Sequence, residues 1–388
     1  MSRLLVVSHT GRGTGFGKVA AEIATALGGA HEVHLVGLGG ALPGETWCAH
    51  DHDPRFDPMR TAAAARLAAD LRPSAAVLVG EARVLGWMAA RMRGDGGYPG
   101  PILAYIPLEG EVADSGGLAG LRHITVPVAY THTAAATLRS AWKNDDATEI
   151  LRSLTVIPHG VDPPEPRPLG TLAQTRERLF PDHSGDFGAC WLLNANRNDI
   201  RKRPELTLRA FARVAEQHLD ATLVLHCAPR RRGLDLRIER DRLGLRGRVI
   251  LTKELDDTPW PLAALNELYH CCEIGVNSAS GEGWGLVAFE HAARGGAQIL
   301  PQHPSLLEIW GSAPAWIGLG PEVRADSICV GREPDVNALA LAMSDLIARP
   351  ARRHEVAAAC AARAADPLLR WSAVGERWLE LVEALDSI

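Results

Sequence analysis

Two carboxylates eight residues apart, Glu282 and Glu290, form the most informative pattern in the chain, within the segment GEGWGLVAFE. An apolar run, EIGVNSA, comes before this glycine-rich turn, and a helical pattern, LVAFEHAAR, follows it. We therefore expect the backbone N–H groups of Gly285 and Leu286 to lie at a helix N-terminus, where a negatively charged ligand binds well. Taken alone, Glu282 also fits an ordinary turn residue, and Glu290 fits a salt-bridging helix residue.

Two cations, Arg197 and Lys202, stand five residues apart in the segment NANRNDIRKRPE. Arg197 closes a predicted strand, and Pro204 is typical of the first position of the helix that follows. Cations fixed at such a position can neutralise a departing diphosphate. By itself, the basic triplet at 201–203 also fits a solvated surface cluster.

A third candidate site is the loop SHTGRGTGFGK, which joins the strand LLVVS to an alanine-rich helix. Its four alternating glycines suit an anion held by backbone N–H groups. A Walker A loop is excluded, because Gly11 lies one residue too far from Gly17-Lys18, Gly13 lies one too near, and Val19 lacks a hydroxyl. A dinucleotide fingerprint also fails, since the spacing differs and the second strand ends in glycines. A tight turn without any ligand remains an alternative.

Composition narrows the class of protein. The chain has 388 residues, a net charge of −5 and a pI near 6.3, which argues against a general nucleic-acid or anionic-membrane binder. Seven scattered cysteines without a C-x-x-C pair indicate a reducing compartment rather than disulfides or zinc. We find no signal-peptide pattern and no apolar run of 18 residues, so we expect a cytoplasmic protein.

Two local segments could suggest other partners. The arginine-rich residues 229–248 are interleaved with acids, as in a solvated helix face with ion pairs, which we favour over RNA binding. The apolar residues 82–94 could touch a membrane, but their short length and few cations favour packing within a domain.

Short apolar runs alternate with helical patterns along the whole chain, which predicts βαβ units and parallel sheets. The proline-rich segment 161–170 interrupts the alternation and reads as a linker. We therefore expect an α/β protein of two doubly wound, Rossmann-like domains, 1–163 and 164–369, facing an interdomain cleft. A C-terminal amphipathic helix at about 370–388 should pack back on the first domain.

These segments together resemble glycosyltransferase family four, the retaining GT-B enzymes. The resemblance rests on Glu-x7-Glu, on Arg-x4-Lys, on VIPHGVD at 156–162 and on the glycine loop, in the same order over nearly the whole chain. It implies that the second domain binds a nucleotide-sugar donor and that the first domain is the acceptor side.

The resemblance also implies roles for individual residues. Arg197 and Lys202 would bind the donor diphosphate and stabilise the charge that develops as the nucleotide leaves. Glu290 would hold the ribose hydroxyls, and Glu282 would contact the transferred sugar.

Backbone groups complete the implied donor site. Gly285 and Leu286 would offer N–H donors, and Gly15 would let the first-domain backbone approach the diphosphate. UDP is the nucleotide that the family favours, although no base-reading residue is assigned; His226 and the segment 252–255 are placed near the base. The nucleotide sugar is a substrate, so no cofactor is expected.

One position departs from the family. Many members carry a histidine after about the fourth strand of the first domain, whereas this chain has IPLEGEV there. Glu109 is therefore the candidate for orienting the nucleophilic acceptor hydroxyl, with a purely structural carboxylate as the equal alternative. His132 and His159 could also line the cleft, and His159 fits better as a residue that shapes the interdomain turn.

Retention of configuration allows double displacement or front-face attack. Because the motifs offer no unambiguous nucleophile, we favour front-face attack on an oxocarbenium-like centre. A small molecule, a lipid and a protein side chain all remain possible acceptors, and the oligomeric state is open. The alternatives are a non-catalytic protein that binds a sugar nucleotide or a partner, and an epimerase or hydrolase of the same fold.

Metal independence is the first testable prediction. The triplet DHD at 51–53 matches the D-x-D pattern of manganese-dependent enzymes, but we place it in a polar loop between helical segments, where such triplets arise by chance. Acceptor-dependent nucleotide release should therefore be the same with and without EDTA. Activity that disappears with EDTA and returns with manganese would contradict this expectation.

Overall fold

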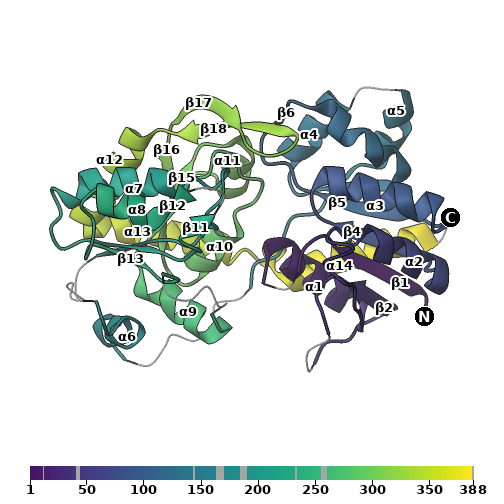
Figure 1. The fold of residues 1–388 in the computed structure, drawn as a ribbon, viewed down its shortest axis with the longest axis horizontal. Coiled ribbons are helices and arrows are strands. Elements are labelled where there is room, and N and C mark those ends of the chain that lie inside the picture. Colours follow the sequence, from purple (N-terminus) through teal and green to yellow (C-terminus); the bar gives the residue numbers. More distant parts are fainter. Residues whose placement is uncertain are drawn as a thin grey trace. The chain divides into compact units, whose positions relative to one another are not determined.

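A computed structural model describes residues 1–11, 13–40, 44–142, 145–162, 170–183, 190–231, 234–254 and 260–386. The chain divides into two compact units (Figure 1). The first unit comprises Met1–Gly160, Ser327–Cys329 and Pro367–Ile388, and the second comprises Val161–Asp326 and Val330–Asp366. Most of the expected linker, residues 163–169, lies outside the described residues, as does Arg12 of the glycine loop.

The first unit is built on a seven-stranded parallel sheet of order β3-β2-β1-β4-β5-β7-β8. Its central strands are fully buried apolar runs, as expected for a parallel sheet that is covered on both faces. The strands are β1 (Arg3–Ser8), β2 (Glu32–Val36), β3 (Cys48–His50), β4 (Ala75–Val79), β5 (Ile102–Ile106), β7 (Val126–Ala129) and β8 (Thr155–Val156), and β6 (Glu111–Val112) lies outside this sheet.

Helices follow the strands of the first unit, and the C-terminal helix α14 (Trp371–Asp386) joins them. Val374, Trp378 and Val382 on α14 are fully buried, and α14 packs along α1 (Figure 1). The remaining helices are α1 (Gly15–Leu27), α2 (Thr61–Leu71), α3 (Ala82–Gly94), η1 (Ser115–His123), α4 (His132–Ala141), α5 (Asp145–Arg152) and η2 (Pro367–Leu369).

The second unit repeats the plan with a six-stranded parallel sheet of order β13-β10-β9-β14-β15-β16. Its strands are β9 (Trp191–Asn194), β10 (Thr222–Leu225), β13 (Val249–Leu251), β14 (Ile274–Val276), β15 (Ala297–Pro301) and β16 (Ala315–Ile317). Two antiparallel pairs lie outside this sheet: β11 (Arg230–Arg231) with β12 (Leu234–Asp235), and β17 (Leu319–Arg324) with β18 (Cys329–Pro334).

Eight helices accompany this sheet within the described residues. Phe211 on α7 and Phe289 on α10 are almost fully buried in its core, together with Trp191 of β9. The helices are α6 (Leu172–Leu179), α7 (Pro204–Ala215), α8 (Leu236–Arg242), α9 (Leu262–Cys271), α10 (Leu286–Ala293), α11 (Pro304–Trp310), α12 (Val336–Ala348) and α13 (Pro350–Ala364). The expected pair of Rossmann-like α/β domains is therefore confirmed.

The polar segments were harder to predict from sequence than the apolar ones. The edge strand β3 (Cys48–His50) was not expected, and the DHD triplet directly follows it, so placing that triplet between helical segments was wrong. The strand has no apolar run that would predict it from sequence. In the structure, His50 Nε2 on this strand lies 2.8 Å from His34 Nδ1 on the neighbouring strand β2. His159 lies in the core of the first unit, with its Nδ1 3.0 Å from the Tyr105 hydroxyl.

Other expectations are met more directly. Arginines of the segment 229–248 pair with its acids: Arg237 with Asp235, and both Arg240 and Arg246 with Asp241. Helix α3 turns most of its apolar residues inward. Within the described ranges, no helix combines the length and apolar character needed to cross a bilayer.

The glycine loop yields a stability prediction. A Cβ at Gly17 would collide with the backbone carbonyl of Gly11, whereas a Cβ at Gly94 would meet no atom within 4 Å. Gly17→Ala should therefore destabilise the protein by about 1–3 kcal/mol. Gly94→Ala should be neutral or stabilise it by up to about 1 kcal/mol, since alanine favours a helix. Urea denaturation measures both, and equal behaviour of the two variants would contradict the described loop.

Candidate functional site

The ends of two adjacent strands, β9 and β14, bring the candidate segments together. Asn194 closes β9, and its Nδ2 donates to Ser278 Oγ, just beyond β14, at 3.2 Å and to Thr207 Oγ1 at 2.8 Å. Because β9 and β14 are parallel neighbours, their following loops leave the same edge of the sheet. Sequence motifs eighty residues apart therefore meet there.

Asp199 shapes the loop that carries the cations. Its Oδ1 accepts hydrogen bonds from the backbone N–H groups of Arg201 and Lys202, each at 3.1 Å, and its Oδ2 lies 3.5 Å from Arg197 Nη2. Burial would raise the pKa of Asp199, but the charges of Arg201 and Arg197 and the N–H of Lys202 lower it. Asp199 therefore stays ionised and fixes the backbone on either side of the cations.

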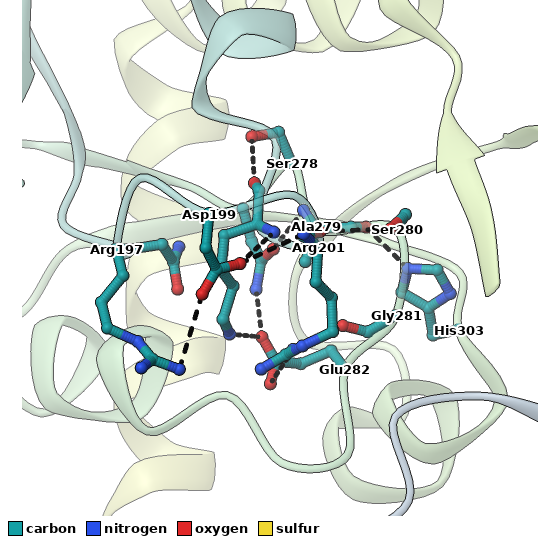
Figure 2. A network of polar contacts seen from close by, with 12 residues as sticks. Arg197, Asp199, Arg201, Ser278, Ala279, Ser280, Gly281, Glu282 and His303 are labelled. Carbon is teal, nitrogen blue, oxygen red and sulfur yellow. Dashed lines mark hydrogen bonds and ion pairs between the residues drawn. The ribbon is translucent and has the colours of Figure 1, made fainter. Parts of the chain in front are cut away.

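Glu282 forms the centre of the cluster. Its carboxylate pairs with Lys202 Nζ, lies 3.6 Å from Arg201 Nη1 and accepts from Asn277 Nδ2 at 3.3 Å. Burial opposes ionisation of this carboxylate, but the charges of Lys202 and Arg201 and these hydrogen bonds lower its pKa to about 2. Figure 2 shows Arg197, Arg201 and Glu282 extending to the same side of the two loops.

Hydrogen bonds to backbone carbonyls join the two loops to each other. Ser280 N–H donates to the carbonyl of Arg201 at 2.7 Å, Arg201 Nη1 donates to the carbonyl of Gly281 at 2.7 Å, and Ser278 Oγ donates to the carbonyl of Lys202 at 3.1 Å. His303 supports the same loop, with its Nε2 2.8 Å from the carbonyl of Ala279 (Figure 2). The arrangement is therefore rigid before any ligand arrives.

The idea that residues 201–203 form a solvated cluster is wrong. The side chains of Arg201 and Lys202 are only 13% and 10% exposed, and that of Arg203 is 19% exposed and pairs with Glu205 and Glu333. Arg201 is the member of the cluster that the motif did not single out. Sequence alone gives no signal that separates a buried arginine from its exposed neighbours.

The turn before α10 has the expected form. Gly285 adopts a left-handed conformation with φ of +86°, and Leu286 is the first residue of α10. A Cβ at Gly285 would lie 3.6 Å from Glu282 Cγ, so this helix N-terminus is directly beside the ion pair. The positive end of the helix dipole therefore adds to the positive character of this edge.

Glu290, one turn inside α10, is held by a residue that the sequence did not suggest. Tyr269, on α9, donates from its hydroxyl to Glu290 Oε2 at 2.8 Å. Burial and the Glu290 charge raise the pKa of Tyr269 well above its usual value, so the hydroxyl remains a donor. Nothing in the segment LNELYHCC indicates that this tyrosine contacts Glu290.

Gly15 and Glu109 belong to the first unit and not to the unit that carries the cations. Gly15 opens α1 after the N-cap Thr14, whose Oγ1 accepts from Gly17 N–H at 3.1 Å. Glu109 follows β5 and is half-buried. Burial, followed by the charge of Glu109, raises the pKa of Tyr130. Each residue thus lies beyond the carboxyl end of a strand.

Two further candidates lie elsewhere. His226 follows β10, with its Nδ1 2.7 Å from Thr252 Oγ1; burial and Lys253 lower its pKa to about 4, so it is neutral at pH 7. Asp53 of the DHD triplet pairs with Arg55 at 2.7 Å. Across the described ranges, no group of three or more histidines, cysteines or carboxylates is arranged to hold a metal.

Solved structures of other proteins have the same architecture. Anabaena Alr3699/HepE in complex with UDP-glucose is similar, with a TM-score of 0.74 at 14% identity over the full length of both chains. Sucrose-phosphate synthase from Thermosynechococcus elongatus gives a TM-score of 0.74 at 18% identity, again over both full lengths. The chain has the GT-B fold.

A third solved structure agrees with this fold. The trehalose 6-phosphate synthase of Burkholderia multivorans has a TM-score of 0.69 at 14% identity, covering 100% of this chain and 99% of the other. No protein-family model and no curated protein matches the sequence. The GT-B fold is thus recognised through structure.

The buried ion pair generates a prediction on stability. Glu282→Gln would leave Lys202 and Arg201 buried without this carboxylate, and should cost about 3–5 kcal/mol at pH 7. The pKa of Glu282 in the folded protein is near 2, below the ordinary 4.5. The wild type should therefore be more stable than Glu282→Gln by the full amount above pH 4.5, and this difference in unfolding free energy should be lost as the pH falls toward 2. Urea denaturation between pH 2 and 7 measures the difference.

The exposed Glu322 provides the control, since Glu322→Gln should change stability little at any pH. Equal stability of wild type and Glu282→Gln at pH 7 would contradict the ion pair. A gap that stays constant down to pH 2 would contradict the lowered pKa.

Proposed function

We propose that the protein is a family-four, retaining glycosyltransferase that transfers a sugar from a nucleotide diphosphate sugar, UDP-sugar in first place, to an acceptor hydroxyl. The observation that carries this proposal is the buried pairing of Lys202 with Glu282 beside Arg201 and the N-terminus of α10. A binding site for a sugar diphosphate needs cations for the phosphates and a carboxylate for sugar hydroxyls. Both are present in one rigid cluster.

Charge balance supports a departing diphosphate as the ligand. Arg197, Arg201 and Lys202 face two carboxylates, Asp199 and Glu282, so the cluster carries one net positive charge. Arg197 is 56% exposed, so its guanidinium can reach a ligand from its position beside Asp199. Fixed cations of this kind stabilise the charge that grows on a leaving group, because they need no reorganisation during the reaction.

Glu290 is the proposed ribose ligand. Its Oε2 accepts a hydrogen bond from Tyr269, a neutral donor that orients the carboxylate. An oriented carboxylate accepts two vicinal hydroxyls well. HepE, which has a similar structure, is solved in complex with UDP-glucose, and this supports the choice of a uridine nucleotide.

Front-face attack is the proposed mechanism. Glu282 is already engaged by Lys202, Arg201 and Asn277, which suits a group that orients the sugar and opposes a role as free nucleophile. The leaving phosphate would then take the proton of the acceptor hydroxyl. Glu109 in the first unit is the proposed residue that orients this hydroxyl, and no metal takes part.

Removal of either cation tests the proposal. Lys202→Ala and Arg197→Ala should each lower acceptor-dependent nucleotide release by a factor on the order of 10² to 10³, because each removes leaving-group stabilisation. The matched control is Arg246→Ala, which removes an exposed arginine that pairs with Asp241 on the surface. Circular dichroism would show whether each variant is folded.

Nucleotide release with and without acceptors distinguishes the function classes. A transferase releases UDP only with an acceptor, whereas a hydrolase releases it without one and a binding protein releases none. Full transfer activity in a folded Lys202→Ala or Arg197→Ala variant would overturn the assignment of these residues.

A further inference from the structure

A cavity lies at the edge of the second unit's sheet opposite the ion-pair cluster. It encloses about 450 Å³ and is lined by residues that come directly before strands: Cys272 and Glu273 before β14, and Gly295 before β15. The ion-pair cluster, in contrast, follows the carboxyl ends of β9 and β14. In parallel strands these are opposite ends, so the cavity and the ion-pair cluster lie at opposite edges of the sheet.

Two arginines make the lining of this cavity positively charged. Arg294 is only 9% exposed; its Nε donates to Asn266 Oδ1, its Nη1 donates to the carbonyl of Glu290 at 2.9 Å, and its guanidinium lies over the ring of Tyr269. Arg353, on α13, is half-buried and donates to the carbonyl of Leu346 at 2.9 Å. Among the described residues, neither arginine has a carboxylate within ion-pair distance.

The acidic residue in the described lining does not balance these charges. Glu273 Oε2 is 2.8 Å from Arg176 Nη2 and accepts the N–H of Trp191 at 2.8 Å. Arg176 is itself 1% exposed, so Glu273 is committed to compensating it. The cavity therefore retains an excess of positive charge, and a guanidinium buried without a counter-charge costs free energy that an anionic ligand would recover.

We propose that this cavity binds a phosphorylated small molecule, with the phosphate group held by Arg294 and Arg353. Guanidinium groups match phosphate oxygens in both charge and geometry. The volume is within the range of small-molecule sites. Thr171, the N-cap of α6, and Thr175 on α6 form another wall of the cavity. This site goes beyond the proposed transfer reaction and does not depend on it.

The experiment uses inorganic phosphate as the probe and calorimetry on the full-length protein at fixed pH and ionic strength. Lys202→Ala serves as the background, because it weakens phosphate binding at the proposed donor site. Phosphate should bind this background saturably, and addition of Arg353→Gln should raise the dissociation constant about tenfold or more, as expected for loss of one charge-assisted contact. Arg294→Gln should do the same where circular dichroism shows it folded.

Arg352→Gln is the matched control, since Arg352 is the exposed neighbour on α13 that pairs with Glu355. It should leave the dissociation constant unchanged. Absence of saturable binding in the Lys202→Ala background, or equal affinity in Arg353→Gln and Arg352→Gln, would overturn the site. Arg353→Gln in the otherwise wild-type protein should release nucleotide at the wild-type rate when no phosphate is added. A change in phosphate binding can then be distinguished from a change in the transfer reaction.

Discussion

The ion pair between Lys202 and Glu282 is the interaction on which the second unit's functional edge depends. Both side chains are withdrawn from water, so each would be costly without the other. Arg201 adds a second cation beside this carboxylate, which keeps Glu282 ionised. The remaining positive charge of the cluster is that of Arg197, which is 56% exposed.

The sheet makes this pairing possible. Parallel strands end at a common edge, so β9 and β14 deliver their loops to one place, and the residues that follow them are tied together by backbone hydrogen bonds. Asp199 and Ser278 hold the loop of the cations through hydrogen bonds to its backbone, and the start of α10 lies beside Glu282. In the proposed reaction, such preorganised dipoles and charges would not have to rearrange as the bond breaks.

Sequence predicted the parts of this protein that carry strong patterns. Apolar runs revealed both sheets, and Pro204 marked the start of α7, because burial and backbone restriction are local properties. The paired motifs also predicted which segments meet. The roles of Arg201 and Tyr269 were missed, since burial of a cation and the aim of a hydroxyl depend on tertiary neighbours. The polar strand β3 was missed for the same reason, and so was the membership of Ser327–Cys329 in the first unit.

A crystal structure with bound UDP-sugar tests the central claim most directly. We expect diphosphate oxygens within about 3 Å of Lys202 Nζ and of the Arg197 guanidinium, with Glu282 accepting a sugar hydroxyl and Glu290 accepting the ribose hydroxyls. A nucleotide sugar bound at a distance from these four side chains, with the Lys202–Glu282 pair unchanged, would contradict it.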